Sequence, residues 1–504
     1  IILLKKRSLE MKKPYQKPTI ARRKMGISSK FVENPESKFQ DRIDDIPVTQ
    51  LVEQYSSPLF VYSYRKLKNI YETAYRAFSK RYPKVHFAWS YKTNYLQAIC
   101  KAYHNLGSRA EVVSEWEYDL ARSMGNSGDK IIFNGPYKSY TGLKRAIQED
   151  AIINIDSFDE IYDIEQIAGE LDKKVEIGMR VNMHLTTLKS WDRFGLNIES
   201  GQAYEAVKRI VASEWLSLRG LHSHIGTFVL SGNVYGEQVA KMLEFIKLIR
   251  QNFGIKIQYI DIGGGFASHN KLKESIYPAA YQIIPSFDQY AEAICPQILN
   301  AFPVEELPTL YLETGRALVD EAGYLITTVV ASKRMTNGRR MLILDGGVNL
   351  LFTAFWYDHQ ILPVENKEHL NQEQQHVYGP LCMQIDGVCD SVNLPYLEKG
   401  DQVVVHPVGA YNNTQWMQFI HLRPNVVMIG EDGSTAIIRE AETTEYVRQP
   451  EKIPDWLMSP SQKPPNKPDI QTKVIPLNRT EDSNSPEGKP GDKNILINRK
   501  GSEE

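Results

Sequence analysis

The stretch Phe87-Ala88-Trp89-Ser90-Tyr91-Lys92-Thr93-Asn94 ends an apolar run with a lysine and two short polar residues. A lysine at the carboxyl end of a buried strand is partly desolvated, which lowers its pKa and makes its amine available for Schiff-base chemistry. The alternative is a solvated surface lysine, the commonest state of this residue type. Taken with the rest of the chain, the stretch predicts a reactive amine at Lys92.

Outward from this stretch, short branched apolar runs alternate with segments of helical spacing. The runs lie at residues 85–90, 110–113, 131–134, 151–156, 175–182, 218–224, 257–263 and 310–313. Strands that are each followed by a helix, in this number, are typical of an α/β protein with a (β/α)₈ TIM barrel. A doubly wound open sheet would give a similar pattern over any half of the chain.

The residues at the ends of these runs favour the barrel. They are polar, charged or glycine at every run: Lys92, Glu111, Asn134, Asp156, Arg180 with Asn182, His222 with His224, Gly263-Gly264-Gly265, and Glu313 with Arg316. A barrel brings the carboxyl ends of all its strands to one mouth, where such enzymes place their chemistry, whereas an open sheet spreads them along an edge. We therefore expect these side chains to share one site.

After Arg316 the pattern changes to strand after strand, which indicates a second, β-rich domain. Its expected strands lie at 323–332, 341–345, 402–406, 425–429 and 435–439, and the run 58–62 is a candidate to join its sheet. We predict a disordered basic arm (1–40), a barrel domain (41–320, with 45–62 as a candidate addition to the β domain's sheet), a C-terminal β domain (321–447) and a disordered tail (448–504).

Bulk composition narrows the classes of partner. Of 504 residues, 60 are Lys or Arg and 61 are Asp or Glu, a balance that predicts neither nucleic acid nor a membrane as partner. No apolar run approaches the ~20 residues that span a bilayer. The four cysteines (Cys100, Cys295, Cys382 and Cys389) lack zinc-site spacing and disulfide-scaffold density, so we expect a cytoplasmic protein with no metal site.

The three glycines at 263–265 follow an apolar strand directly, which lets main-chain N–H groups approach an anion without hindrance. The full dinucleotide fingerprint is missing, and so is the Gly-Lys-Ser/Thr of nucleotide-phosphate loops. A phosphate site and a Schiff-base lysine at one barrel mouth together suggest pyridoxal 5'-phosphate.

That cofactor needs a carboxylate beside its pyridine nitrogen, because the protonated ring is the better electron acceptor. Glu313 ends the eighth run and is the candidate, with Arg316 facing the phosphate. The flat ring of His224 suits stacking on the cofactor, and His222 points to the same side of its strand and can support it.

Six ordered motifs resemble the fold-type III PLP-dependent decarboxylases, which include the diaminopimelate, ornithine and arginine decarboxylases. They are Tyr91-Lys92-Thr93-Asn94, His222-Ser223-His224-Ile225-Gly226-Thr227, Asp261-Ile262-Gly263-Gly264-Gly265-Phe266, Glu313-Thr314-Gly315-Arg316, Gly379-Pro380-Leu381-Cys382 and Gly409-Ala410-Tyr411. The resemblance runs from about residue 58 to 429 and is closest in motif layout to diaminopimelate decarboxylase.

The resemblance implies roles for individual residues. Lys92 forms the Schiff base, His224 stacks on the pyridine ring, and Glu313 pairs with its nitrogen. Gly263, Gly264, Gly265, Arg316 and Tyr411 bind the phosphate, and Glu111 matches an acidic residue that follows the second strand. Family members are homodimers with shared active sites, and the cysteine matching Cys382 reaches the partner's cofactor. Cys382 or Lys92 is the candidate acid that reprotonates the α-carbon after CO₂ leaves.

Two departures from the family pattern affect the substrate. Met383 stands where diaminopimelate and ornithine decarboxylases have an acidic residue, and Thr353-Ala354 stand where diaminopimelate enzymes have an arginine-proline pair. Tyr357 matches the family and Arg193 retains a family-like feature, so both are candidate substrate contacts. Loss of a buried charge partner changes discrimination between polar substrates.

The expected activity is decarboxylation of an amino acid, diaminopimelate or a related diamino acid. Two alternatives stay open. A PLP-dependent racemase would share the barrel and the lysine, although racemases usually set an arginine, not a glutamate, against the pyridine nitrogen. A catalytically inactive relative that binds a partner protein would not need Lys92, Glu313 and Cys382.

Overall fold

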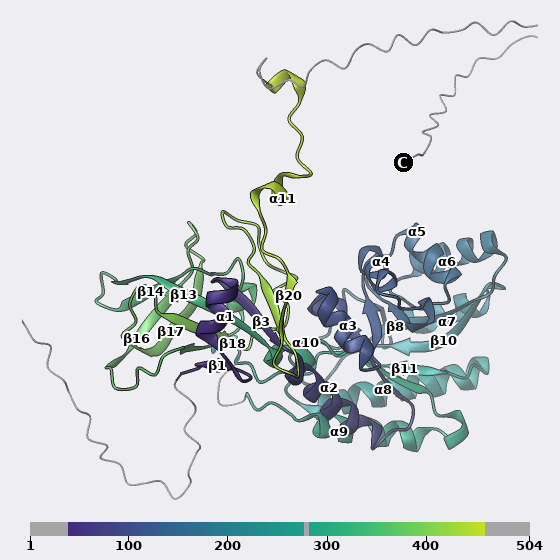
Figure 1. Ribbon diagram of the computed structural model, residues 1–504. Coiled ribbons are helices and arrows are strands. Elements are labelled where there is room, and N and C mark those ends of the chain that lie inside the picture. The colour runs from purple at the N-terminus through teal and green to yellow at the C-terminus, as the bar shows by residue number, and fades with distance from the viewer. Residues whose placement is uncertain (1–38, 277–281, 459–504) are drawn as a thin grey trace, which may run out of the picture. The chain divides into compact units, whose positions relative to one another are not determined.

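The computed structural model describes residues 39–276 and 282–458 of the chain (Figure 1). Nearly all of the predicted basic arm and the predicted tail beyond residue 458 lie outside the described residues. Residues 39–446 form one compact unit and residues 447–458 belong to a second, in which a 3-10 helix, η7 (Asp455–Leu457), forms.

The first part of the compact unit is a closed barrel of eight parallel strands. Each strand pairs with the next in sequence, and β12 pairs with β4 to close the ring. The strands are β4 (Val85–Ser90), β5 (Arg109–Val112), β6 (Ile131–Phe133), β7 (Ile152–Ile155), β8 (Val175–Asn182), β10 (Leu216–His222), β11 (Tyr259–Asp261) and β12 (Thr309–Leu312), with the two-residue β9 (Leu196–Asn197) added beside β8.

A helix follows each barrel strand and packs its apolar face against the outside of the ring (Figure 1). These helices are α3 (Gln97–Asn105), α4 (Glu115–Ser123), α5 (Tyr140–Gln148), α6 (Phe158–Leu171), α7 (Gln202–Val211), α8 (Gly232–Phe253), α9 (Phe287–Ala301) and the short α10 (Arg316–Val319), with α2 (Tyr64–Ser79) ahead of β4. Serine side chains cap several of them: Ser114 and Ser157 accept from the backbone N–H three residues on, and Ser286 forms a capping box with Gln289.

The β-rich part follows the barrel. Its strands are β13 (Gly323–Arg334), β14 (Arg340–Leu344), β15 (Gln360–Pro363), β16 (Gln372–Tyr378), β17 (Gly387–Pro395), β18 (Gln402–His406), β19 (Val426–Ile429) and β20 (Thr435–Arg439). The early strand β3 (Leu59–Ser63) lies between β13 and β19 in this sheet, antiparallel to β13 and parallel to β19. The predicted fold class, a TIM barrel followed by a β-rich region, is confirmed.

The smaller elements are β1 (Arg42–Ile43), β2 (Ile46–Pro47), α1 (Val48–Tyr55) and α11 (Thr444–Arg448). Sequence reasoning missed β15, β16 and β17. The run Gln372-Glu373-Gln374-Gln375 has no apolar residue and so gives no apolar signal of a strand; it forms one by pairing with β14 and β17.

The β-rich part also completes the barrel mouth. Tyr411 donates its N–H to the carbonyl of Thr93 at 2.8 Å, and the Thr414 hydroxyl donates to the carbonyl of Lys92 at 3.0 Å. The Asn94 amide donates to the Gly409 carbonyl at 3.1 Å. The segment that carries Lys92 is therefore held by residues from more than 300 positions later in the chain.

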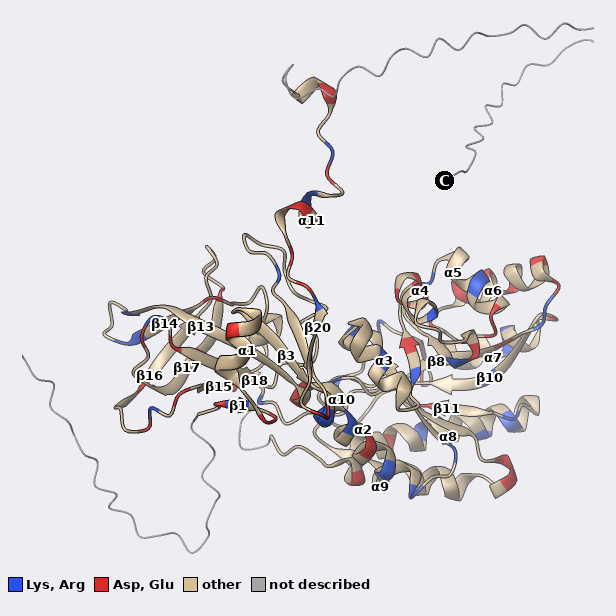
Figure 2. Ribbon diagram, in the orientation of Figure 1, with Lys and Arg blue, Asp and Glu red and all other residues tan. Residues whose placement is uncertain are grey.

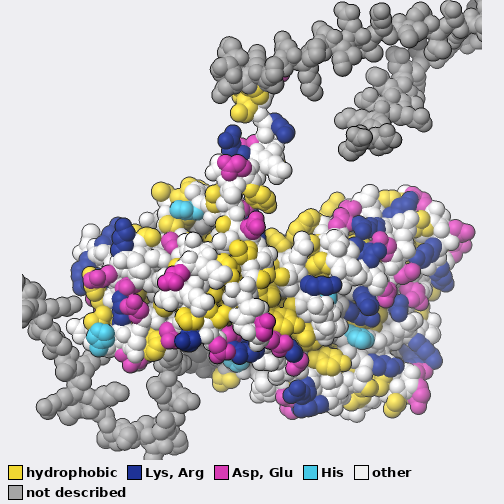
Figure 3. All heavy atoms as spheres, in the orientation of Figure 1, with side chains coloured by type: hydrophobic (Ala, Val, Ile, Leu, Met, Phe, Trp, Pro, Cys, Tyr) yellow, Lys and Arg dark blue, Asp and Glu magenta, His cyan; other side chains and the backbone are white. Residues whose placement is uncertain are grey.

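Both basic and acidic residues occur on the outer helices (Figure 2), and their side chains are interspersed over the face shown in Figure 3. This distribution agrees with the nearly balanced composition of the chain. None of the helices in residues 39–276 and 282–458 combines the length and apolarity needed to cross a lipid bilayer.

Candidate active site

Lys92 lies in the 3-10 helix η1 (Tyr91–Thr93), which begins where β4 ends and turns the chain into the barrel mouth. Its Nζ donates to both carboxylate oxygens of Glu111, at 2.8 and 2.6 Å, and 40% of its side-chain surface is exposed. Burial lowers the pKa of Lys92, but the charges of Glu111 and Glu313 outweigh burial and raise it. The predicted lowering of the Lys92 pKa is therefore wrong, because desolvation was considered without the carboxylates from neighbouring strands.

Asn134 connects the partner of Lys92 to Glu313 across the barrel mouth. Its amide nitrogen donates to Glu111 at 3.2 Å and also to Glu313, while its oxygen accepts from Asn154 at 2.9 Å. Glu111 and Asn154 lie one residue before the ends of β5 and β7, and Asn134 and Glu313 directly follow β6 and β12, so these strand ends converge at this point of the mouth. Polar groups buried at such a point are stabilised by mutual hydrogen bonds.

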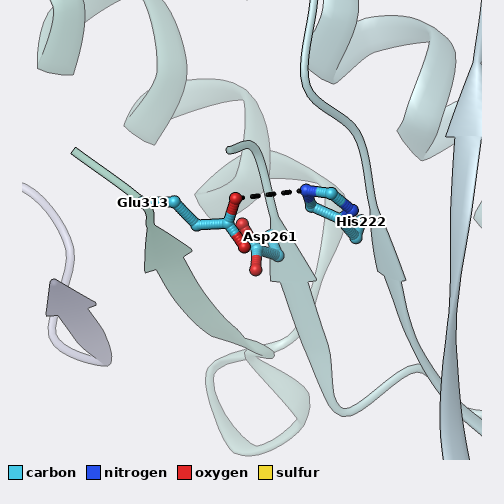
Figure 4. A group of neighbouring side chains, drawn as sticks. All are labelled: His222, Asp261 and Glu313. Carbon is cyan, nitrogen blue, oxygen red and sulfur yellow. Dashed lines mark ion pairs between the residues drawn. The ribbon is translucent and has the colours of Figure 1, made fainter. Parts of the chain in front are cut away.

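Glu313 forms a buried cluster with His222 and Asp261, which come from the neighbouring strands β10 and β11 (Figure 4). One ligand-type atom from each lies within 4.8 Å of the others. Glu313 Oε2 lies 3.3 Å from Nε2 of His222, although the two groups are not aligned for a hydrogen bond.

The two carboxyl groups of this cluster differ in protonation. Burial and the charge of Glu313 raise the pKa of Asp261 well above its usual range. Burial acts in the same direction on Glu313, but His222, Lys92 and the neighbouring Asp261 outweigh it and lower the pKa of Glu313. Glu313 is thus the ionised member of the pair and Asp261 the protonated one. An ionised carboxylate at the end of β12 suits a protonated ring nitrogen.

His224 faces the three glycines. Its Nδ1 accepts from the N–H of Gly264 at 3.1 Å. Burial, together with the charges of Arg180 and Lys92, lowers the pKa of His224 to about 3, so its ring is neutral near neutral pH. Trp191 packs against this ring edge to face at a centroid distance of 5.5 Å. A neutral flat ring fixed in this way is suited to stacking on an aromatic cofactor.

Glycine is required at positions 263–265, because neighbouring backbone lies too close for a side chain at Gly264 and because Gly263 and Gly265 have positive φ angles. A Cβ on Gly264 would lie 2.3 Å from the carbonyl oxygen of Glu313, and Gly263 and Gly265 have φ of +69° and +96°. The N–H of Gly263 donates to Asp261 at 2.9 Å and that of Gly264 to His224, so two of the three predicted anion-binding N–H groups have partners within the chain. The segment therefore offers an anion close backbone approach more than a set of free donors.

Arg316, Tyr357 and Tyr411 form a second group beside these glycines. The Arg316 guanidinium lies 4.7 Å from the Tyr357 ring centroid and 4.8 Å from that of Tyr411. Its Nε and Nη1 are buried without a hydrogen-bond partner, and the carboxylate of Asp320 lies 3.8 Å from Nη1, beyond hydrogen-bond reach. Buried guanidinium donors left unsatisfied are costly, and a phosphate would satisfy them. The residues present therefore fit a phosphorylated cofactor.

Two predicted residues lie apart from this cluster. Arg193 is exposed and stacks on Phe194 at 4.7 Å. Cys382 is exposed on the loop between β16 and β17 and takes no part in the contacts described for Lys92 and Glu313. The structure assigns contacts to two residues that sequence reasoning gave no role: Asp261, beside Glu313, and Asn154, which donates to the predicted Asn134. Both lie near the carboxyl end of a barrel strand, which is the signal that could have found them.

A closed barrel with a lysine at its mouth, an ionised carboxylate opposite and an unsatisfied arginine defines a pyridoxal-phosphate protein of the barrel type. Residues 67–320 match the family model of the pyridoxal-dependent decarboxylases, pyridoxal binding domain. The chain belongs to this family, its cofactor is pyridoxal phosphate, and it is a pyridoxal-phosphate-dependent carboxy-lyase.

Individual relatives support the assignment over most of the chain. Diaminopimelate decarboxylase of Aquifex aeolicus is 28% identical over 433 residues, 83% of this chain and 97% of the relative. That of Helicobacter pylori strain J99 is 30% identical over 409 residues, 79% of this chain and 96% of the relative. The crystal structure of diaminopimelate decarboxylase from Methanocaldococcus jannaschii with L-lysine has a TM-score of 0.76 at 28% identity, covering 83% of this chain and 97% of that one.

Proposed function

We propose that this protein decarboxylates diaminopimelate or a related diamino acid, with Lys92 as the amine that holds the cofactor's aldehyde. One observation carries the proposal: a continuous hydrogen-bonded path runs from Lys92 through Glu111 and Asn134 to the carboxylate of Glu313. The names of the relatives support the class of substrate.

Each residue has a separate task in this proposal. Glu313 holds the ring nitrogen protonated, and His222 and Asp261 keep Glu313 ionised. Arg316, Tyr411 and the glycine segment 263–265 hold the phosphate, with the neutral ring of His224 against the pyridine face. The chemistry that bound pyridoxal phosphate supplies is an electron sink for the pair left when the α-carboxylate departs as CO₂.

Proton return to the α-carbon needs an acid near the mouth. Lys92 is one candidate, because the Glu111 carboxylate keeps a proton on its Nζ. Cys382 is the other, in a homodimer whose active sites are shared, since its thiol is exposed and free to enter a partner's site. Tyr357, buried beside Arg316, and Arg193 are the proposed substrate contacts. The cytoplasm suits a chain with an exposed free thiol.

The test has two parts. Purified protein should show the absorbance band of lysine-bound pyridoxal phosphate, and Lys92→Ala should lose it while Lys101→Ala, a lysine on α3 outside the site, should keep it. CO₂ release is then measured with L-, D- and meso-diamino acids. Inversion of configuration without CO₂ would identify a racemase, and absence of the band in the unchanged chain would identify a binding protein.

A further inference from the structure

A cavity of about 740 Å³ opens beside the proposed cofactor site and shares Arg316, Tyr357 and Tyr411 with it. Its remaining wall comes from several segments. Leu188 and Trp191 follow β8, Phe228 and Leu230 follow β10, Leu272 and Ile276 follow β11, and Trp356 directly follows the 3-10 helix η6 (Phe352–Phe355). The cavity therefore lies where the part of a substrate distant from its reacting carbon would extend.

The wall of this cavity is poor in charge. Among the residues that the structure describes, 39–276 and 282–458, Arg316 is the only charged side chain that lines it. A free ammonium at the far end of a substrate would thus meet no carboxylate from the same subunit and would share the cavity with a cation. In the proposed homodimer the loop that carries Cys382 would bring Met383, not an acidic residue, to the shared site. A free carboxylate would compete with the phosphate for the same guanidinium. Either charge would lose hydration without a partner of its own.

The side chain of Thr353, a polar residue of the cavity wall, already has hydrogen-bond partners within the chain. Thr353 stands where the diaminopimelate pattern has an arginine, and it lines the cavity. Its hydroxyl donates to Asn412 at 2.9 Å and lies 2.9 Å from Nε2 of His359. All three residues belong to the β-rich part, so the hydroxyl stabilises that side of the wall instead of offering a charge to the ligand.

The large apolar side chains of the wall are partly open to water. Trp191 is 38% exposed and Trp356 is 41% exposed, while Leu230 packs against the buried pair Phe228 and Tyr357. Covering such side chains with an apolar group is favourable.

We propose that this cavity receives an uncharged, largely apolar group at the far end of the substrate, which makes the substrate a diamino acid whose second amine is capped, for example by an acyl chain. The inference rests on the proposed decarboxylation and specifies its substrate class. If the acyl group of the substrate enters the cavity, each added methylene that is fully buried should improve binding affinity roughly fourfold.

The experiment uses the holoenzyme and a homologous series. CO₂ release is measured with lysine, meso-diaminopimelate, and Nε-acetyl-, Nε-butanoyl- and Nε-hexanoyl-lysine, each lysine compound in both configurations. Binding of the corresponding product amines is followed by tryptophan fluorescence, because Trp191 and Trp356 line the cavity. The expected result is a rise in kcat/KM and in product affinity of at least tenfold from acetyl to hexanoyl, with hexanoyl-lysine at least tenfold better than lysine.

Two variants test whether the cavity is responsible. Leu230→Asp places a carboxylate in the wall; it should reduce the dependence of kcat/KM on acyl length and raise kcat/KM for free lysine. Trp356→Ser, at the rim, should reduce the dependence on acyl length more weakly. Leu248→Asp is the matched control, because Leu248 is 40% exposed on α8 and does not line the cavity.

The outcomes separate the two proposals. Rapid CO₂ release from free lysine or meso-diaminopimelate with a flat acyl series would overturn the capped-substrate inference and leave the decarboxylase in place. No CO₂ from any compound, with length-dependent binding of the product amines, would overturn the decarboxylase and support the assignment of the cavity. Neither turnover nor length-dependent binding would overturn both.

Discussion

Glu111→Gln should lower the pKa of Lys92 and speed the capture of pyridoxal phosphate at neutral pH. The carboxylate of Glu111 lies 2.6 and 2.8 Å from Lys92 Nζ and stabilises its ammonium form. At an effective dielectric constant of 20, two charges at this separation interact by about 6 kcal/mol. Because 40% of the Lys92 side chain is exposed, solvent screening reduces this to about 2 or 3 kcal/mol, which corresponds to roughly two pH units.

The assay follows the reconstitution of apoenzyme. An amine attacks an aldehyde only when it is unprotonated, so the rate at which the bound-cofactor absorbance appears should rise with pH and report the pKa of Lys92. In Glu111→Gln this profile should move about two pH units lower. Glu117→Gln is the graded control, because Glu117 is a buried carboxylate that accepts from the Val113 N–H at 2.8 Å and not from Lys92. Its charge still interacts with Lys92, so this variant should move the profile in the same direction but by much less. An unchanged profile, or one that moves to higher pH, would refute the reasoning.

Three further predictions concern stability and cofactor affinity. Burial raises the pKa of Glu117 from 4.5 to about 7, so Glu117 ionises at lower pH in the unfolded chain, and the free energy of unfolding should fall by about 3 kcal/mol as the pH rises between these values. Glu117→Gln should remove this fall, which is measured as denaturant midpoints from pH 4 to 8. An equally steep fall in the variant would contradict the assignment. Gly264→Ala should abolish cofactor binding, because its Cβ would lie 2.3 Å from the Glu313 carbonyl oxygen. Gly169→Ala, whose Cβ would lie 3.8 Å from the nearest atoms of Trp215, should bind the cofactor normally. Equal affinities of the two variants would contradict this expectation. Arg316→Lys should weaken binding of pyridoxal phosphate roughly 10- to 100-fold by equilibrium dialysis, since a lysine keeps the charge but loses the guanidinium geometry, and unchanged affinity would remove Arg316 from the phosphate site.

The sequence alone determined the barrel and its cofactor chemistry. Alternating strand and helix periodicity is local, and polar residues at strand ends stand out against apolar runs, so Lys92, Glu313 and the glycine segment could be found without coordinates. The resemblance to the family added Tyr411 to the predicted site, although no local sequence signal connects this residue of the β-rich part to the barrel.

Tertiary structure decided what depends on contacts between distant segments. It raised the pKa of Lys92, because Glu111 and Glu313 come from other strands, and it placed β3 in a sheet formed mostly by strands more than 250 residues later. It also placed a cavity beside Arg316, and the wall of this cavity comes from several segments that are distant in the sequence. The physical reason is the same in each case: burial and periodicity are properties of one segment, whereas electrostatic fields and cavity walls belong to several segments packed together.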